Sequence, residues 1–247
     1  MTDAADKLKW AFIGPGGVRA GWRFAAFVAL WYGGEYALFP LLSLFYTFTD
    51  TGFTPMDILV FESGDALLLV LISLLLARFE KHGPGWFGFG WGRASLSQFG
   101  IGSLLGFGMV TLLLLASFCS GQGSVQGFAV HGAELGKYLL IWLGGMLLVG
   151  VSEEVLFRGY ALRSLMGGIG FWPAACLLSL IFGAEHLGKP MENVPDILNI
   201  VLLGLALCYS VRQTGALWFG IGFHAAFDFF ALAFYGSPNT GNNGLPL

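Results

Sequence analysis

The sequence predicts an all-α protein, a polytopic bundle of about seven helices that crosses a lipid membrane around a polar intramembrane cavity. Three observations predict this class. Of the 247 residues, 56% are hydrophobic and only 11% are charged, whereas about 25% of a soluble domain is normally charged. The mean hydropathy is +0.74. Apolar runs also reach the roughly 20 residues that a helix needs to cross the hydrocarbon core. This composition excludes a soluble enzyme, a disulfide scaffold and a nucleic-acid-binding protein.

Seven apolar runs are predicted to be membrane-spanning helices. Turn-forming residues separate them, and the first run is expected to be a retained span because no small-residue cleavage pattern follows it. The sequence shows neither an internal repeat nor a second domain, so residues 1–247 are predicted to form one membrane domain. The runs cover about 22–48, 57–79, 99–119, 138–166, 170–187, 195–212 and 214–235, with breaks at 49–55, 82–92, 120–127 and 188–190.

The basic residues predict how the chain is oriented. Cytoplasmic loops carry the excess of Lys and Arg. With residues 1–21 as a cytoplasmic N-terminal tail and seven spans, only Lys137 and Lys189 of the 12 basic residues lie outside. We therefore expect an integral membrane protein with a cytoplasmic N-terminus, in a bacterial cytoplasmic membrane. The inside set is Lys7, Lys9, Arg19, Arg23, Arg78, Lys81, Arg93, Arg158, Arg163 and Arg212.

Ionisable residues inside the predicted spans are the candidates for chemistry. Such residues are costly at bilayer depth and usually face the bundle interior or a wet cavity. The first half of the chain contributes Glu35, Glu62 and Asp65. The second half is richer and more regularly spaced, and its candidates are Glu153, Glu154, Arg158, His186, His224 and Asp228.

The fourth run contains two adjacent acids with different helical neighbours. Residues four apart share a helix face, so Glu154 is expected to pair with Arg158. Glu153 points about a quarter of a turn away and has no obvious local cation, which makes it a candidate general base. From this segment alone, a purely structural network of both acids and Arg158 is an equally good interpretation.

Two histidines on separate spans favour the functional interpretation. A single His on an apolar face is more often a satisfied core residue, but here His186 and His224 accompany an unpaired Glu on a third span. Asp228 is four residues after His224 and is expected to orient its imidazole. At about 1.5 Å per residue, Glu153 lies roughly 20 Å from the cytoplasmic ends of the spans, His186 roughly 24 Å and His224 roughly 15 Å. These depths permit a common site, and His186 is the deepest of the three residues.

Other intramembrane chemistries lack their motifs. No Gly-x-Ser-x-Gly sequence indicates a serine hydrolase, and no His-Glu-x-x-His sequence indicates a zinc protease. The aspartyl-protease Gly-x-Gly-Asp pattern is approached at Asp65, but Glu62 stands at its first Gly and a matching Asp on a neighbouring span is missing.

Three spaced motifs resemble the type II CAAX prenyl endopeptidases, which are grouped with bacteriocin-processing and immunity proteins as the CPBP or ABI family. Each motif is weak alone, but all three occur in order within the predicted motif-bearing core, residues 138–235. They are Glu153-Glu154-x-x-x-Arg158-Gly159, Phe182-x-x-x-His186 and His224-x-x-x-Asp228.

The resemblance implies an intramembrane endopeptidase that cuts a membrane-associated peptide or protein within the lipid bilayer. It implies that Glu153 and His186 activate a water molecule, that His224 and Asp228 stabilise the oxyanion, and that Glu154 and Arg158 support the helix. The prenyl proteases have Asn where this chain has Asp228, and an Asp donates a hydrogen bond only when protonated. Asp228 is thus expected to hold the His224 tautomer, which moves the oxyanion role largely to His224.

Three other functions are compatible with these residues. The protease could use zinc, with Glu153, His186 and His224 as ligands, although the favoured mechanism needs no cofactor. The protein could instead be a non-catalytic membrane scaffold or a bacteriocin immunity protein. The acids of the first two spans also suggest a proton-coupled transporter, which the missing inverted repeat disfavours. The substrate, and whether it is prenylated, does not follow from the sequence.

Overall fold

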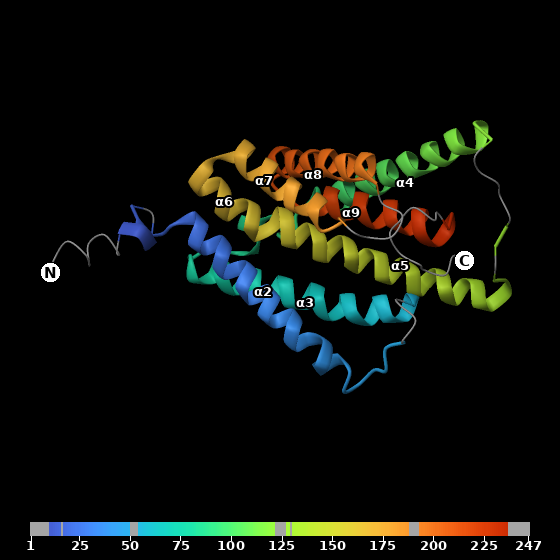
Figure 1. Ribbon diagram of the computed structural model, residues 1–247, viewed down its shortest axis with the longest axis horizontal. Helices are drawn as coiled ribbons and strands as arrows, with labels where there is room; N and C mark the ends of the chain where they lie inside the picture. Colours follow the sequence, from blue (N-terminus) through green and yellow to red (C-terminus); the bar gives the residue numbers. More distant parts are fainter. Residues whose placement is uncertain are drawn as a thin grey trace.

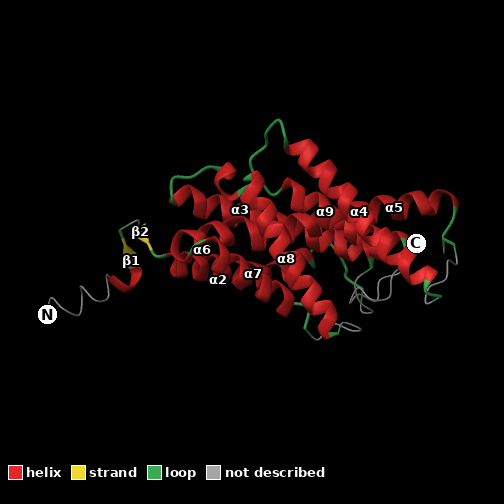
Figure 2. Ribbon diagram, turned by 90° about the horizontal axis from the view of Figure 1, so that it is seen from above, coloured by secondary structure: helices red, strands yellow, loops and turns green. Residues whose placement is uncertain are grey.

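The computed structural model describes residues 10–15, 17–49, 54–121, 127–128, 130–187 and 193–236. These residues form mainly helices, most of which lie along the long axis of the molecule (Figure 1). The strands drawn in Figure 2 belong to a small antiparallel hairpin, β1 (Ile13–Gly14) and β2 (Gly17–Val18), which precedes the bundle. The predicted all-α class is therefore confirmed.

The bundle consists of α-helices, one 3₁₀ turn and two π-helices. In chain order they are α2 (Ala20–Leu42), α3 (Pro55–Phe79), the 3₁₀ turn η1 (Pro84–Phe87), α4 (Ser95–Cys119), α5 (Gly132–Glu154), the π-helix η2 (Val155–Tyr160), α6 (Ala161–Ile169), α7 (Phe171–Ala184), α8 (Val194–Thr214), α9 (Trp218–Asp228) and the π-helix η3 (Phe229–Phe234).

Within the described residues, five helical segments are long and apolar enough to cross a membrane. They are α2, α3, α4, α8 and the 38-residue segment Gly132–Ile169, in which α5, η2 and α6 are continuous. The predicted runs 170–187 and 214–235 form the shorter apolar helices Phe171–Ala184 and Trp218–Phe234. The structure thus confirms a polytopic helical membrane bundle, while the count of seven spans stays a prediction. The predicted break at 188–190, the residues Lys7, Lys9 and Lys189, and most of the 1–21 tail lie outside the described residues.

Capping residues fix where two of the long helices begin. Thr54 accepts a hydrogen bond from the backbone N–H of Asp57, and the Asp57 carboxylate accepts one in return from the N–H of Thr54. Asn193 and Asp196 form the same reciprocal pair at the start of α8. Such a capping box satisfies N–H groups that have no partner within the helix. Asp57 therefore serves a structural purpose at the end of its span.

The bundle is apolar outside and partly polar inside, as expected for a protein in lipid. Leucines project from α4 and α8, and Leu104, Leu112 and Leu202 are each more than 60% exposed. The buried side chains include Ser152, Glu154, Arg158 and His224 beside a large hydrophobic core. An ionisable cluster inside such a bundle is the arrangement expected of an intramembrane functional site.

Glycines bring α4 into backbone contact with α9, which carries the third sequence motif. A Cβ atom at Gly102 would overlap the carbonyl oxygen of Phe219, and one at Gly106 would overlap that of Phe223. From the other side, a Cβ at Gly222 would overlap the carbonyl oxygen of Phe99. Small residues spaced four apart allow membrane helices to approach this closely. Helix α4 thereby fixes the position of His224, which follows Phe223 directly.

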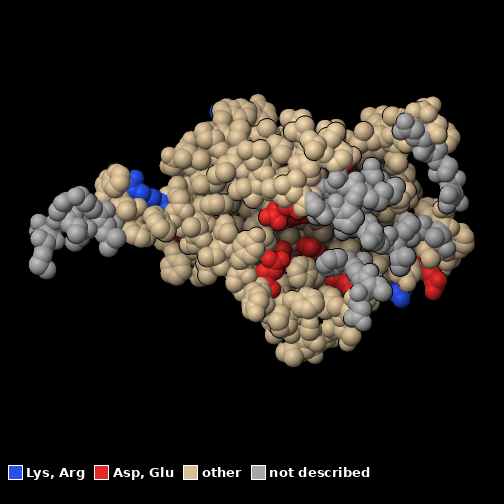
Figure 3. Space-filling view, viewed as in Figure 1, with Lys and Arg blue, Asp and Glu red and all other residues tan. Residues whose placement is uncertain are grey.

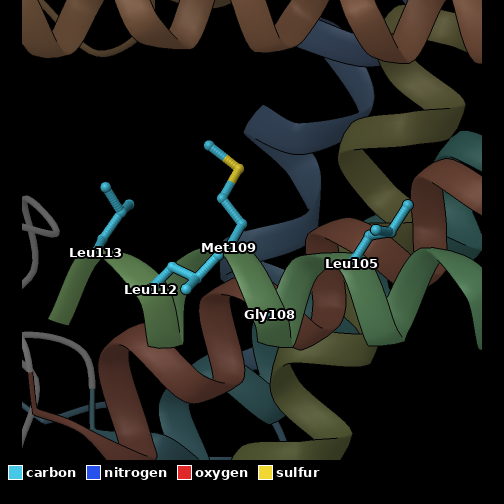
Figure 4. Close-up of a pocket in the computed structure, with 5 residues that line it drawn as sticks. All are labelled: Leu105, Gly108, Met109, Leu112 and Leu113. Atoms are coloured by element: carbon cyan, nitrogen blue, oxygen red, sulfur yellow. The ribbon is translucent and has the colours of Figure 1, made fainter. Parts of the chain in front are cut away.

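We expect Gly106→Ala to destabilise the protein by about 1–3 kcal/mol, because the added methyl group forces two backbones apart. Gly108→Ala is the matched control on the same helix. Gly108 lies in a hollow lined only by apolar residues of α4, where an added Cβ meets no atom within 4 Å (Figure 4). This control should be neutral or slightly stabilising, since Ala favours helices over Gly. Thermal unfolding in detergent measures both changes, and equal melting temperatures for the two variants would contradict the prediction.

Candidate active site

The three sequence motifs converge inside the bundle from four neighbouring elements. Glu153 and Glu154 are the last two residues of α5, Arg158 lies in η2, and His224 and Asp228 lie on α9. Residue Phe182 of the second motif is buried near the end of α7, and His186 follows just after that helix ends. The second-half candidates are thus gathered in one region.

The His224 imidazole is the centre of this cluster. Its Nε2 atom lies 3.3 Å from an oxygen of Glu153 and 3.3 Å from an oxygen of Asp228. Its Nδ1 atom lies 3.4 Å from Glu154 Oε1. His224 is 9% exposed, so its ring is largely removed from solvent. An imidazole that faces carboxylates through both ring nitrogens is held in one orientation, and either nitrogen can act as a donor.

The predicted pair of Glu154 and Arg158 is present and fully buried. Arg158 Nη1 donates to Glu154 Oε1 at 3.0 Å, and the two side chains are 1% and 0% exposed. The Arg158 guanidinium also lies 4.3 Å from the centre of the Phe182 ring, a favourable cation–π distance. Gly220 on α9 leaves room for the pair, because a Cβ there would overlap the Glu154 carboxylate.

Glu153 differs from its neighbour in partner and in exposure. Its carboxylate contacts His224 and is 29% exposed, whereas that of Glu154 is 0% exposed. Asp228 is also partly exposed, at 23%. Glu153 and Asp228 are therefore the acids of the cluster that a substrate or a water molecule can reach, while Glu154 is enclosed with Arg158.

His186 is adjacent to the cluster but separated from it by an aromatic ring. Its Nδ1 atom lies 3.0 Å from the carbonyl oxygen of Phe182. The Phe182 ring packs edge-on against both imidazoles, with centroid distances of 5.3 Å to His186 and 6.1 Å to His224. Within the described part of the chain, no hydrogen bond or ion pair joins His186 to Glu153. The structure thus brings Glu153, His224 and Asp228 together and leaves His186 beside them.

A π-helix follows each of the two acidic motif segments. The η2 segment begins directly after Glu154, and η3 begins directly after Asp228. Gly159 inside η2 departs from helical geometry, with φ −80° and ψ −118°. Short π-segments in α-helices occur frequently at functional sites. Sequence spacing gave no sign of them, because a pattern with a period of 3.6 residues assumes a regular helix.

The acids of the first half of the chain approach the same site, which the sequence did not indicate. Glu62 of α3 accepts a hydrogen bond of 2.9 Å from Ser152, the residue before Glu153. Asp65 accepts one of 3.1 Å from the indole of Trp31. Glu35 lies on α2, the helix that also carries Trp31. Figure 3 shows that Asp and Glu side chains gather in a hollow on one face of the molecule.

The predicted zinc ligands are not arranged as a metal site. Among the described residues, no group of three His, Cys, Asp or Glu side chains is placed to hold a metal ion. Glu153 and His224 are in contact, but His186 lies across Phe182 from His224. The three residues do not fit a zinc ion in this arrangement, and no chemical step is assigned to one.

The fold and the cluster together define an integral membrane protein with an ionisable centre inside its helical bundle. A family model described as type II CAAX prenyl endopeptidase, Rce1-like, matches residues 135–230, which include all three motifs. The match covers less than half of the chain and agrees with the resemblance based on the motifs, which is thereby confirmed. A comparison with curated proteins finds no match. A membrane protease of this class has a membrane-embedded protein substrate and a lipid environment.

Proposed function

We propose that the protein hydrolyses a peptide bond within the membrane, with Glu153 as the general base. Water attacks the scissile carbonyl carbon while Glu153 takes one of its protons, and the C–N bond of the tetrahedral intermediate then breaks as protonated Glu153 returns that proton to the leaving amine. Base catalysis of this kind contributes about 10²–10⁴ to a rate. The observation that carries the proposal is the contact between partly exposed Glu153 and buried His224, in the segment that matches the protease family.

His224 is the proposed donor to the developing oxyanion. A donor fixed in advance in a low-dielectric site stabilises this charge more strongly than water does. Contacts with Asp228 and Glu154 restrict the ring on both sides, which supports this role. His186 is proposed to help position the attacking water, as the resemblance implies, and its place beside Phe182 supports a role at the edge of the site.

The test is cleavage of membrane peptides by the purified protein in proteoliposomes. Prenylated and unprenylated peptides, together with leader-type peptides, are compared as substrates. Loss of cleavage in both Glu153→Ala and His186→Ala, with folding intact, would establish catalysis and its residues. Cleavage by the wild type that survives in both variants would contradict the proposed mechanism.

One observation favours a non-catalytic scaffold or a bacteriocin immunity protein as the second candidate. The enclosed contacts of Glu154 with Arg158 and His224 are those of a structural network that joins the continuous α5–η2 segment to α9. A scaffold would keep its cellular effect in Glu153→Gln, because this change preserves the shape of the side chain. A protease would lose its effect in the same variant.

Chelators separate the metal-free mechanism from the zinc alternative. We expect cleavage to persist in EDTA or 1,10-phenanthroline, because the described residues do not form a three-ligand metal site. The measurement is the initial cleavage rate before and after chelation, together with the metal content of the purified protein. Loss of cleavage that added Zn²⁺ restores would contradict the prediction and support a site of Glu153, His186 and His224.

We also propose that the end of the bundle where α2 begins faces the cytoplasm of a bacterial cell. Arg23 near the start of α2 pairs with Glu80 just after α3, at 2.5 Å. Arg163 of α6 donates to the carbonyl oxygen of Gly215, just after α8. Two basic residues, one on α2 and one on α6, thus lie near the ends of α3 and α8, which supports the positive-inside orientation.

A further inference from the structure

A hydrogen bond joins the candidate active site to a part of the chain that the family match does not cover. Ser152 Oγ donates to Glu62 Oε2 at 2.9 Å, across 90 residues of sequence. Ser152 is 3% exposed and directly precedes Glu153 on α5. Glu62 lies on α3, well before residue 135, where the match begins.

A second buried acid, Asp65, lies beside the partner of Ser152 on α3. Asp65 lies three residues after Glu62, so the two share one face of the helix. Asp65 is 6% exposed and accepts a hydrogen bond from Trp31 of α2. One face of α3 thus makes a hydrogen bond to α2 through Asp65 and another to α5 through Glu62, and the second ends one residue before the proposed base.

Packing between α3 and α5 does not depend on this hydrogen bond. A Cβ at Gly144 would lie 3.1 Å from Leu59, and one at Gly145 would lie 3.3 Å from Ile58. The two helices are therefore already close two turns before Ser152. Burying a hydroxyl and two carboxyl groups in a membrane bundle is costly unless they are hydrogen-bonded. Because α3 and α5 already pack closely without the hydrogen bond between Ser152 and Glu62, this bond is better explained by a role in the candidate active site.

From these contacts we infer that Ser152 and Glu62 are positioning residues, which hold the end of α5 so that the Glu153 carboxylate is aimed at the scissile bond. This inference rests on the proposed function. The side chain of Ser152 points to α3, and its fixed direction determines where the next side chain on the helix points. Without the hydrogen bond, the last turn of α5 keeps the Glu154 contacts but loses this polar contact with α3, so the turn shifts and Glu153 moves away from its place beside His224.

The expected loss is in the rate of the chemical step. A misplacement of about 1 Å costs about a hundredfold in rate without weakening substrate binding. We therefore expect Ser152→Ala and Glu62→Leu each to lower kcat about 10- to 100-fold, with KM within about twofold of wild type. Glu62→Gln keeps an oxygen that accepts from Ser152, so its kcat should stay within about threefold of wild type.

The experiment measures kcat, KM and melting temperature for five proteins in proteoliposomes. They are the wild type, Ser152→Ala, Glu62→Leu, Glu62→Gln and the double variant Ser152→Ala/Glu62→Leu. Ser103→Ala is added as a sixth protein and serves as the control, since the Ser103 hydroxyl donates to the carbonyl oxygen of Phe99 on its own helix. If both residues act through one hydrogen bond, the double variant loses no more than the worse single variant.

Several outcomes would overturn the inference while leaving the proposed function intact. One is a kcat within twofold of wild type for both Ser152→Ala and Glu62→Leu when Glu153→Ala is inactive. Another is an equal fall in kcat for Glu62→Gln and Glu62→Leu. A third is a change in KM with no change in kcat. If Glu62→Leu does not fold, the kcat values of Ser152→Ala and Glu62→Gln are compared instead. A kcat for Ser152→Ala that is no lower than that of Glu62→Gln would overturn the inference. Failure of the proposed function would give a different result. Either the wild-type protein would not cleave the peptide, or Glu153→Ala would cleave it as fast as the wild type.

Discussion

Replacing Glu153 by Gln should reduce cleavage of a membrane peptide by about 10²–10⁴, the usual contribution of a general base. The amide keeps the size of the carboxylate and its contact with His224, but it is too weak a base to accept a proton from water. Because the Glu153 side chain is 29% exposed and stands outside the enclosed Glu154–Arg158 pair, we expect little change in folding. Single-turnover cleavage in proteoliposomes, with thermal unfolding alongside, measures both quantities.

Glu134→Gln is the matched control for this prediction. Glu134 is an exposed acid in the first turn of the same helix, far from the motifs. Its replacement should leave the cleavage rate unchanged. A Glu153→Gln protein that cleaves within about threefold of wild type would remove Glu153 as the base and strengthen the scaffold interpretation.

Replacing Arg158 by Met should lower the free energy of unfolding by about 3–5 kcal/mol, the cost of breaking a buried ion pair from one side. Arg158 is 0% exposed, and its loss leaves the buried Glu154 carboxylate with His224 Nδ1 at 3.4 Å as its remaining ionisable partner. Denaturant unfolding in micelles measures the change. Arg212→Met is the control, since Arg212 is exposed and stacks on Phe171 at the surface, and it should cost less than about 1 kcal/mol.

The double variant Glu154→Leu/Arg158→Met tests the physical reason for this loss. It removes both buried charges, so it should recover much of the stability that Arg158→Met loses. If the double variant is less stable than Arg158→Met alone, the cost lies in lost packing rather than in an unpaired charge. That result would contradict the explanation.

The sequence predicted contacts within a helix better than contacts between helices. Glu154 and Arg158 pair as their spacing of four residues predicts, and His224 and Asp228 meet for the same reason. Such contacts depend only on helical geometry, which short-range spacing contains. The gathering of both pairs on neighbouring helices was expected from the resemblance to the family.

The position of His186 could not be predicted from the spacing of residues along the sequence. It follows Phe182 by four residues, but it lies just beyond the end of α7 and its Nδ1 faces the Phe182 carbonyl oxygen. Spacing does not determine where a helix ends or how it tilts, so the distance from His186 to Glu153 could not be predicted. The rough depth estimate placed His186 deepest of the three residues but did not separate it from Glu153.

The contact between Glu62 and Ser152 was beyond prediction for another reason. The sequence singled out Glu62 and Asp65 as costly intramembrane acids but gave them no partner. Their partner lies 90 residues away on a helix whose apolar pattern does not mark Ser152. The π-helices η2 and η3 were equally hidden, since the extra residue in each turn leaves no trace in composition.

The shortness of two helices has a consequence for how the site obtains water. Neither Phe171–Ala184 nor Trp218–Phe234 exceeds 17 residues, so each is at most about 26 Å long, against about 30 Å of hydrocarbon. A bilayer adapts to short helices by thinning around them. The lipid on this side of the bundle is therefore expected to be shallow, which shortens the path from the aqueous phase to the two imidazoles. A hydrolase needs such a path, because water is its second substrate and is otherwise excluded from the hydrocarbon core of the membrane.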